Sequence, residues 1–263
     1  ALRGHRGELF GLKPSQVGWI IFSGVFLAFH FATWISSLEY TTVASSVVLV
    51  STTPLWVAIF SPVFLHERPT FWVALGMVVS LVGGSLVGIS EACQFQAGRV
   101  VCPPVEVFIQ GSAFWGNLLA LAGALSAAAY LIVGRWLRPT LSLVVYITTV
   151  YGVAAVVLVA MALFSGNQLG GFPPSVYLAC LALAVGPQLL GHTSLNYGLR
   201  FLSATFVSVV MLGEPISSTI LALLILKETP TILEIAGGVI ILFGIYLASR
   251  SQAASQPTQA VRG

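Results

Sequence analysis

Long apolar runs alternate with short polar breaks along almost the whole chain. A helix needs roughly 20 apolar residues to cross the hydrocarbon core of a bilayer, and helices satisfy their own backbone hydrogen bonds there. The pattern predicts eight such helices, over 16–38, 42–65, 69–90, 112–136, 139–165, 174–198, 203–226 and 230–249. The Ser/Gln/Ala-rich residues 251–263 are expected to form a disordered tail. The predicted fold class is therefore an all-α membrane protein.

One stretch of this pattern occurs twice, over about 42–88 and 203–249. Each copy has a proline within an apolar run, then a Glu-x-Pro break, and then a second apolar run that contains glycines. The landmarks Pro54, Glu67, Pro69, Gly76 and Gly83 recur as Pro215, Glu228, Pro230, Gly237 and Gly244, each 161 residues later and without a gap. Such self-similarity indicates an internal duplication, and duplication within a membrane chain is typical of transporters.

The composition indicates that lipid surrounds much of the chain, and the placement of the basic residues predicts its orientation in the membrane. The chain is 57% hydrophobic and 7% charged, whereas soluble domains carry roughly 25% charged residues. The net charge of +3 and the lack of a basic face argue against a nucleic-acid partner. With the N-terminus in the cytoplasm, most basic residues fall inside: Arg3, Arg6, Lys13, Arg68, Arg135, Arg138, Arg200, Arg250 and Arg262. Only Arg99 and Lys227 fall outside. We therefore expect a multi-pass protein of the plasma membrane (bacterial-type inner membrane), with both termini cytoplasmic.

This orientation places the Glu67 break inside and the Glu228 break outside, so the two copies are inverted relative to each other. Residues 112–250 form a second repeat with five predicted helices, and residues 1–90 form a first repeat with only three. The first repeat is therefore expected to lack two N-terminal helices. Residues 91–111 become an extracytoplasmic loop that contains Cys93 and Cys102, either as a disulfide or as two free thiols.

The segments around these landmarks resemble the two EamA domains of the drug/metabolite transporter superfamily. They are 37–45, Pro54 and 65–69 in the first copy, and 199–205, Glu214, Pro215 and 226–230 in the second. The resemblance implies ten helices in two inverted five-helix repeats, of which this chain has eight. It also implies a central cavity that is reached alternately from each side of the membrane. It does not identify the solute.

Polar side chains within membrane spans are costly and usually face the protein interior or a water-filled cavity. Gln188, His192 and Asn196 are spaced by four and therefore share one helical face, as do His30 and Trp34 on the first predicted span. The full set of substrate-cavity candidates is His30, Trp34, Thr52, Thr53, Tyr130, Gln188, His192 and Asn196. The alternative for each is a hydrogen-bonded packing role.

Three further residues carry mechanistic hypotheses. Glu214 is the only acid well inside a predicted span, which makes it a candidate proton carrier for coupled transport. Its alternative role is a hydrogen bond to backbone freed by the neighbouring Pro215. Pro54 and Pro215 lie at matching mid-span positions, where each is predicted to kink its helix and act as a hinge.

No enzyme signature accompanies these features. The sequence has no Asp, no Gly-rich phosphate loop, no zinc-binding His-Glu-x-x-His helix and no Gly-x-Ser-x-Gly. We therefore expect no enzyme, cofactor or metal site. The predicted function is secondary transport of a small organic metabolite, amino acid-like or neutral, as efflux by alternating access. A non-transporting membrane protein or degenerate transporter fragment is the alternative. The expected partners are the solute and the lipid bilayer. Whether the chain forms a homodimer is left open.

Overall fold

The computed structural model describes residues 2–41, 43–92, 94–96, 99–104, 106, 111–166, 168–221, 223–224, 227 and 229–254. This part of the chain is helical apart from one short hairpin. The first half contains a 3-10 turn (Leu2–His5), α1 (Arg6–Phe10), α2 (Pro14–Ser37), α3 (Val43–Val50), α4 (Thr53–Phe64) and α5 (Phe71–Ala92). The hairpin consists of β1 (Gln94–Gln96) and β2 (Arg99–Val101). The second half contains α7 (Ser112–Leu137), α8 (Leu143–Phe164), α9 (Pro174–Leu183), α10 (Thr193–Gly198), α11 (Ala204–Met211), α12 (Glu214–Leu221) and α13 (Ile232–Ala254). A π-helical segment, η2 (Ala184–His192), joins α9 to α10.

Membrane-length apolar helices confirm the predicted class of protein. In the described residues, five helical stretches are long and apolar enough to cross a bilayer: Pro14–Ser37, Ser45–Phe64, Ser112–Leu137, Leu143–Phe164 and Pro174–Gly198. Two shorter apolar helices, Phe71–Val87 and Ile235–Arg250, lie on two further predicted spans. The number of membrane crossings stays a prediction.

Two of the predicted spans are each interrupted by a two-residue turn. Residues 51–52 separate α3 from α4, and residues 212–213 separate α11 from α12. In both cases a proline, Pro54 or Pro215, is the second residue of the second half. Proline fits the first turn of a helix because its missing N–H would have no intrahelical partner there. Each break therefore creates a new helix N-terminus within the span.

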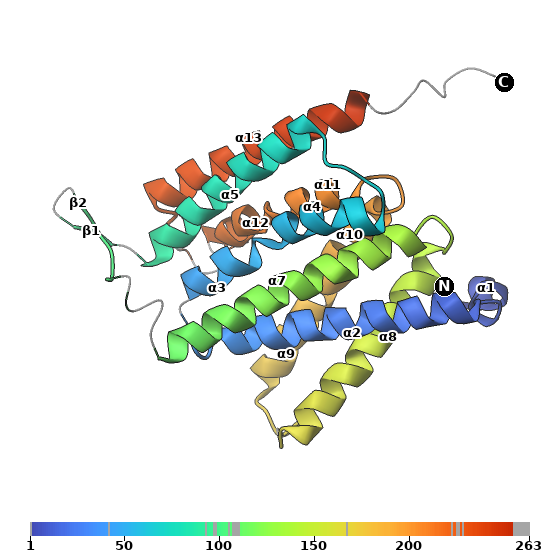
Figure 1. Ribbon diagram of the computed structural model, residues 1–263. Coiled ribbons are helices and arrows are strands. Elements are labelled where there is room, and N and C mark those ends of the chain that lie inside the picture. Colours follow the sequence, from blue (N-terminus) through green and yellow to red (C-terminus); the bar gives the residue numbers. More distant parts are fainter. Residues whose placement is uncertain are drawn as a thin grey trace.

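Helices α5 and α13 lie side by side in an antiparallel contact (Figure 1). Glycine permits this approach, because a Cβ built on Gly83 would lie 2.6 Å from the carbonyl oxygen of Gly237. One built on Gly237 would lie 2.7 Å from the carbonyl oxygen of Gly83. About one helical turn away from this contact, Ser80 Oγ of α5 donates a hydrogen bond of 3.3 Å to the carbonyl of Ile241 of α13. Ile241 is the residue 161 positions after Ser80. Reciprocal contacts of this kind arise between two like surfaces related by a two-fold axis.

Local backbone features recur with the same spacing. The two helix breaks are 161 residues apart. The non-glycine residues with positive φ among those described are His66 (φ 57°) and Lys227 (φ 63°), which occupy equivalent positions. This conformation is uncommon for residues other than glycine. Because it occurs at equivalent positions of the two copies, the duplication seen in the sequence is also present in the backbone conformation.

Burial is uneven across the bundle. Helix α7 is central: Ala120, Ala124 and Ala128 have no exposed surface, and α7 packs along α2 and against α3 and α4. Figure 1 shows α2 and α7 running alongside each other. In contrast, every residue of α9 is exposed. One side of the second half is therefore uncovered in the described structure.

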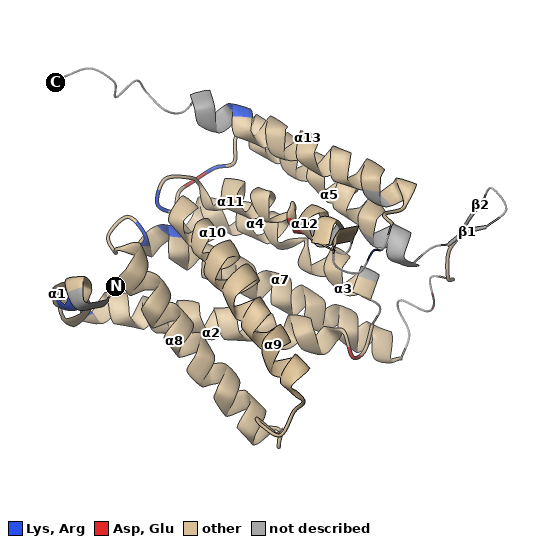
Figure 2. Cartoon of the chain, turned by 180° about the vertical axis from the view of Figure 1, so that it is seen from behind, with Lys and Arg blue, Asp and Glu red and all other residues tan. Residues whose placement is uncertain are grey.

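Basic side chains gather at one end of the molecule, where the α4–α5 and α7–α8 connections and the end of α13 lie (Figure 2). The hairpin β1–β2 lies at the opposite end (Figure 1). Its strands pair Gln94 with Val101, and the adjacent Cys102 is disulfide-bonded. The expected partner, Cys93, lies outside the described residues. This charge distribution agrees with the predicted orientation, which remains a prediction.

Candidate functional site

Polar and aromatic side chains from several helices meet inside the bundle. We call this group the polar cluster: His30 and Trp34 of α2, Tyr130 of α7, Tyr151 of α8, His192 of η2 and Asn196 of α10. His30, Tyr130, His192 and Asn196 are buried. Five of the eight predicted cavity residues therefore lie in one group. Their role in solute binding stays a prediction.

The carboxamide of Asn196 connects three elements of the cluster. Its Nδ2, which carries two N–H donors, lies within hydrogen-bond distance of three acceptors: the hydroxyl of Tyr130, the hydroxyl of Tyr151 at 3.0 Å and the carbonyl of His192 at 2.8 Å. Its Oδ1 is buried and has no hydrogen-bond partner in the described part of the chain. An unpaired buried acceptor costs about 1–3 kcal/mol. This oxygen is therefore available to a donor that enters the cluster.

Aromatic rings surround the two histidines. The His192 ring lies edge-on to Phe31 at 5.4 Å between centroids and 6.1 Å from the Tyr130 ring. The His30 ring stacks on Trp34 at 5.7 Å, and its Nδ1 lies 2.9 Å from the carbonyl oxygen of Gly123.

Two of these residues also present unpaired nitrogens. Trp34 Nε1 and His192 Nδ1 are buried without a hydrogen-bond partner among the described residues. Buried polar atoms of this kind are rare in folded proteins. Together with Asn196 Oδ1, they give the cluster a donor, an acceptor and an imidazole nitrogen that can be either.

The two threonines of the first helix break serve the backbone. Thr52 Oγ1 donates to the carbonyl of Leu49 at 2.6 Å, and Thr53 Oγ1 donates to that of Val50 at 2.8 Å. The carbonyl of Val50 has no N–H donor four residues later because that residue is Pro54, and the Thr53 hydroxyl replaces it. The carbonyl of Leu49 also accepts from the backbone N–H of Thr52 at 3.1 Å. Gln188 is half-buried in η2, and the described contacts do not link it to the polar cluster.

Glu214 is the first residue of α12 and is exposed at the second helix break. The equivalent first residue of α4, 161 positions earlier, is the buried Thr53. A carboxylate at a helix N-terminus interacts favourably with the helix dipole. This placement gives Glu214 a local structural role, and proton transport by it stays a hypothesis.

Arg135 and Glu67 form an ion pair that sequence reasoning missed. Arg135 Nε lies 2.7 Å from Glu67 Oε1, and Arg135 Nη1 donates to the carbonyls of Leu199 and Arg200 at 3.0 and 3.2 Å. Glu67 Oε2 also accepts from the backbone N–H of Ala204, where α11 begins. We call Arg135 and Glu67 the latch, because they tie α7 and the α4–α5 connection to the start of α11.

Two further aromatic residues, Phe31 and Tyr151, were not among the eight predicted cavity residues. Phe31 has no polar group, so only its position next to His30 could have suggested it. Tyr151 is half-buried in α8, a largely apolar helix in which a tyrosine is itself a signal, because a Tyr O–H within the protein usually finds a partner.

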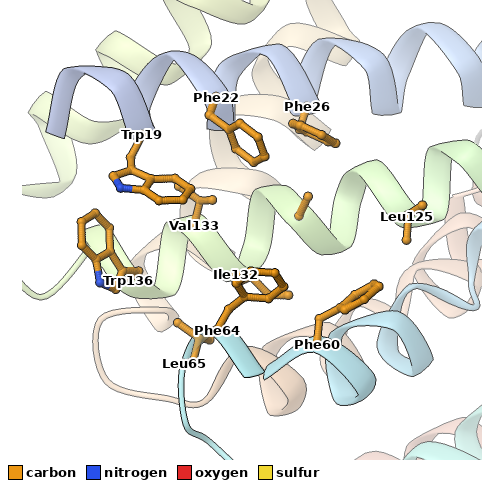
Figure 3. Close-up of a pocket in the computed structure, with 11 residues that line it drawn as sticks. Trp19, Phe22, Phe26, Phe60, Phe64, Leu65, Leu125, Ile132, Val133 and Trp136 are labelled. Carbon is orange, nitrogen blue, oxygen red and sulfur yellow. The ribbon is translucent and has the colours of Figure 1, made fainter. Parts of the chain in front are cut away.

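The described cavity lies elsewhere. It has a volume of about 470 Å³ and lies between α2, α4 and α7 (Figure 3). We call it the apolar groove, and its lining residues are Trp19, Phe22, Phe26, Phe60, Phe64, Leu65, Leu125, Ala129, Ile132, Val133 and Trp136. It shares no residue with the polar cluster. Its lining offers almost no hydrogen-bonding groups, in contrast to the polar cluster.

A bundle of membrane-length helices around a buried polar cluster is typical of a multi-pass membrane protein. The sequence pattern of the EamA-like transporter family matches residues 2–89 and 114–250. The chain therefore belongs to this family, and the resemblance inferred from its repeated motifs is confirmed.

Similar proteins agree with the family. An uncharacterized transporter of Archaeoglobus fulgidus is 24% identical over 247 residues, which are 91% of this chain and 79% of that protein. The uncharacterized transporter YetK of Bacillus subtilis is 27% identical over 235 residues, 86% of this chain and 65% of YetK. A solved crystal structure matches with a TM-score of 0.70 at 19% identity, covering 94% of this chain and 82% of that one. The structural match supports the fold alone.

Proposed function

We propose that this chain is a secondary transporter that moves a small organic metabolite by alternating access, in the efflux direction, with the polar cluster as its solute site. The observation that carries the proposal is the set of unpaired buried atoms on Trp34, His192 and Asn196. They come from both halves of the chain. Polar residues within membrane spans commonly mark substrate pathways.

The chemistry of the polar cluster favours a neutral or amino acid-like solute. Its members supply an indole, two imidazoles, a carboxamide and two phenols, and none carries a permanent charge. A multiply charged anion would lose its hydration without gaining an ionic partner, which is strongly unfavourable. A solute with a few donors and acceptors and an apolar body would instead pair the free groups and pack against Phe31 and Tyr130.

The proposal includes two inverted repeats in a ten-helix fold. The reciprocal glycine contact between α5 and α13 and the equivalent helix breaks support it. Helix α2 packs against α7 and α8, the first two helices of the second repeat. With the 161-residue offset, the segment equivalent to α2 is 175–198, which includes most of α9. If the two repeats pack alike, two helices of the first repeat would pack against α9, as α7 and α8 pack against α2. The exposed surface of α9 is where they would pack.

In this proposal, the conformational changes of the transport cycle take place at the two helix breaks and at the latch. The turns at 51–52 and 212–213, where the regular helical hydrogen-bond pattern is interrupted, are the points at which the half-helices can tilt. The latch closes the basic end of the molecule by joining the two halves. We propose that the latch opens when the polar cluster faces that end, because the loops it connects must then separate.

The alternative is a membrane protein that binds a solute without carrying it across. The exposed face of α9 is the observation behind this alternative, because a transport pathway has to be sealed along its length and α9 is not covered by other helices in the described structure. Flux distinguishes the two functions: a transporter exchanges solute across proteoliposomes, whereas a binding protein does not.

The test begins with a thermal-shift screen of the purified protein against neutral and zwitterionic metabolites. A solute that stabilises the protein is then tested for binding to Asn196→Ala and Tyr130→Phe. We expect binding to weaken about tenfold or more, because each change removes a buried hydrogen-bonding group. Tyr177→Phe, at an exposed tyrosine of α9, is the matched control. Equal binding by all three variants would contradict the proposed site.

A further inference from the structure

The apolar groove opens on the outer surface of the bundle. Phe22 and Phe26 of α2 face Phe60 and Phe64 of α4 across α7, whose small Ala129 contributes to the lining (Figure 3). Phe64 is 61% exposed, and Trp136 and Trp19 are 48% and 40% exposed. These aromatic walls therefore face the surroundings of the protein while enclosing a volume of about 470 Å³.

Neither water nor a polar solute suits this groove. A water molecule needs two to four polar partners to stay in a cavity, and the lining side chains are aliphatic or aromatic apart from two indole N–H groups. Leaving the groove empty would forfeit dispersion contacts along its walls. In a bilayer, the available material of matching chemistry is a lipid acyl chain.

Basic residues near one end of the groove indicate which headgroup the lipid carries. Trp19 and Trp136 close this end with their rings 5.5 Å apart, and tryptophan is enriched where a membrane meets water. Lys13 lies six residues before Trp19, and Arg68 lies three residues after the lining residue Leu65. Both basic residues are exposed.

The acids near this end have partners of their own: Glu8 lies 3.4 Å from His5 and accepts from the backbone N–H of Ser142. Arg135 and Glu67 balance each other in the latch. Figure 2 shows that this end of the molecule carries most of its basic side chains. Basic pockets between membrane helices bind anionic lipid headgroups.

We propose that the apolar groove binds one acyl chain of an anionic phospholipid, whose headgroup phosphate contacts Lys13 and Arg68. The site is separate from the polar cluster and shares no residue with it. It makes this protein a lipid-binding protein on its outer face, independently of which solute it moves.

Native mass spectrometry of the detergent-purified protein tests the proposal by titration with phosphatidylglycerol and phosphatidylcholine of identical acyl chains. We expect phosphatidylglycerol to bind about tenfold more tightly. Ala129→Phe fills the groove and should weaken both lipids about tenfold. Ala122→Phe is the matched control: it makes the same change on an exposed face of α7, outside the groove, and should bind lipid like the unaltered protein.

The headgroup is tested separately. The double variant Lys13→Gln/Arg68→Gln should reduce the preference for phosphatidylglycerol to about one while keeping the binding of phosphatidylcholine. Arg250→Gln, on α13 away from the groove helices, should keep the preference. Circular dichroism establishes that each variant is folded, and a misfolded Ala129→Phe is replaced by Ala129→Leu.

Three results would overturn the proposal. One is equal lipid binding by the Ala129 and Ala122 variants. Another is a preference for phosphatidylglycerol that survives the loss of both Lys13 and Arg68. The third is a dimer mass that disappears only in the Ala129 variant, which would mean that a second copy of the chain covers the groove. Solute binding is measured in parallel and is expected to be unchanged, so failure here leaves the proposed transport function standing.

Discussion

The close contact between α5 and α13 gives a quantitative prediction for Gly83→Ala. The added Cβ would lie 2.6 Å from the carbonyl oxygen of Gly237 and 2.8 Å from the backbone N of Ile241, whereas ordinary contacts begin at 3.4 Å. Both obstacles are backbone atoms, so the clash is relieved only when the helices move apart. Overpacking of this kind costs about 1–3 kcal/mol.

Part of that cost is offset, because alanine is a better helix former than glycine by roughly 0.5–1 kcal/mol. We expect a net destabilisation of about 1–2 kcal/mol for Gly83→Ala. The pseudo-symmetric Gly237→Ala should cost about as much, since its Cβ would lie 2.7 Å from the carbonyl oxygen of Gly83. Equal costs at the two positions would follow from the reciprocal geometry of the contact.

The neighbouring Gly84 supplies the control. A Cβ at Gly84 meets no atom within 4 Å, so Gly84→Ala should be neutral or stabilising by up to about 1 kcal/mol. The assay is reversible unfolding of the three variants in mixed micelles at increasing denaturing-detergent fraction. If Gly83→Ala proves as stable as Gly84→Ala, the close packing of α5 on α13 is wrong.

Three further predictions concern other contacts. Arg135→Gln removes the ion pair with Glu67, so hydrogen exchange should accelerate in residues 199–204, and Glu67→Gln should give a similar increase; unchanged exchange would exclude the latch. Thr53→Val should lower stability by about 1 kcal/mol, because the carbonyl of Val50 loses its donor; unfolding in mixed micelles measures this, and a neutral effect would contradict it. Burial raises the pKa of Glu8, but hydrogen bonds from Ser142 and the nearby His5 outweigh it, so the pKa of Glu8 is lowered from 4.5. The stabilisation is present above about pH 4.5 and is lost as the pH falls through the lowered pKa. Glu8→Gln should therefore reduce the acid dependence of the melting temperature, and an identical pH profile would refute the contact.

Much of the architecture follows from the sequence because bilayer thickness sets the length of an apolar helix. The duplication was equally visible, since its landmarks are Pro and Gly, whose backbone constraints survive changes in the surrounding apolar residues. The spacing by four predicted one face for Gln188, His192 and Asn196, of which His192 and Asn196 are buried. Gln188 lies in the π-helical η2, is only half-buried and is not linked to the other two by the described contacts.

Other features depend on contacts that no local pattern encodes. The latch joins Glu67 to Arg135 across 68 positions, so proximity in sequence suggested only a role at the start of α5. Proline predicted a kink, and the structure adds the detail of a two-residue turn at 51–52 and at 212–213. Sequence spacing did not show that the Thr53 hydroxyl bonds to the carbonyl of Val50, because side-chain rotamers are not determined by spacing.

The most direct test of alternating access through the polar cluster is the accessibility of a cysteine at position 192. The protein carries His192→Cys with Cys180→Ser and is reconstituted in proteoliposomes. A membrane-impermeant thiol reagent is then added on one side at a time. The account predicts labelling from either side, and slower labelling when the transported solute is present. Labelling from one side only, with no effect of the solute, would contradict it.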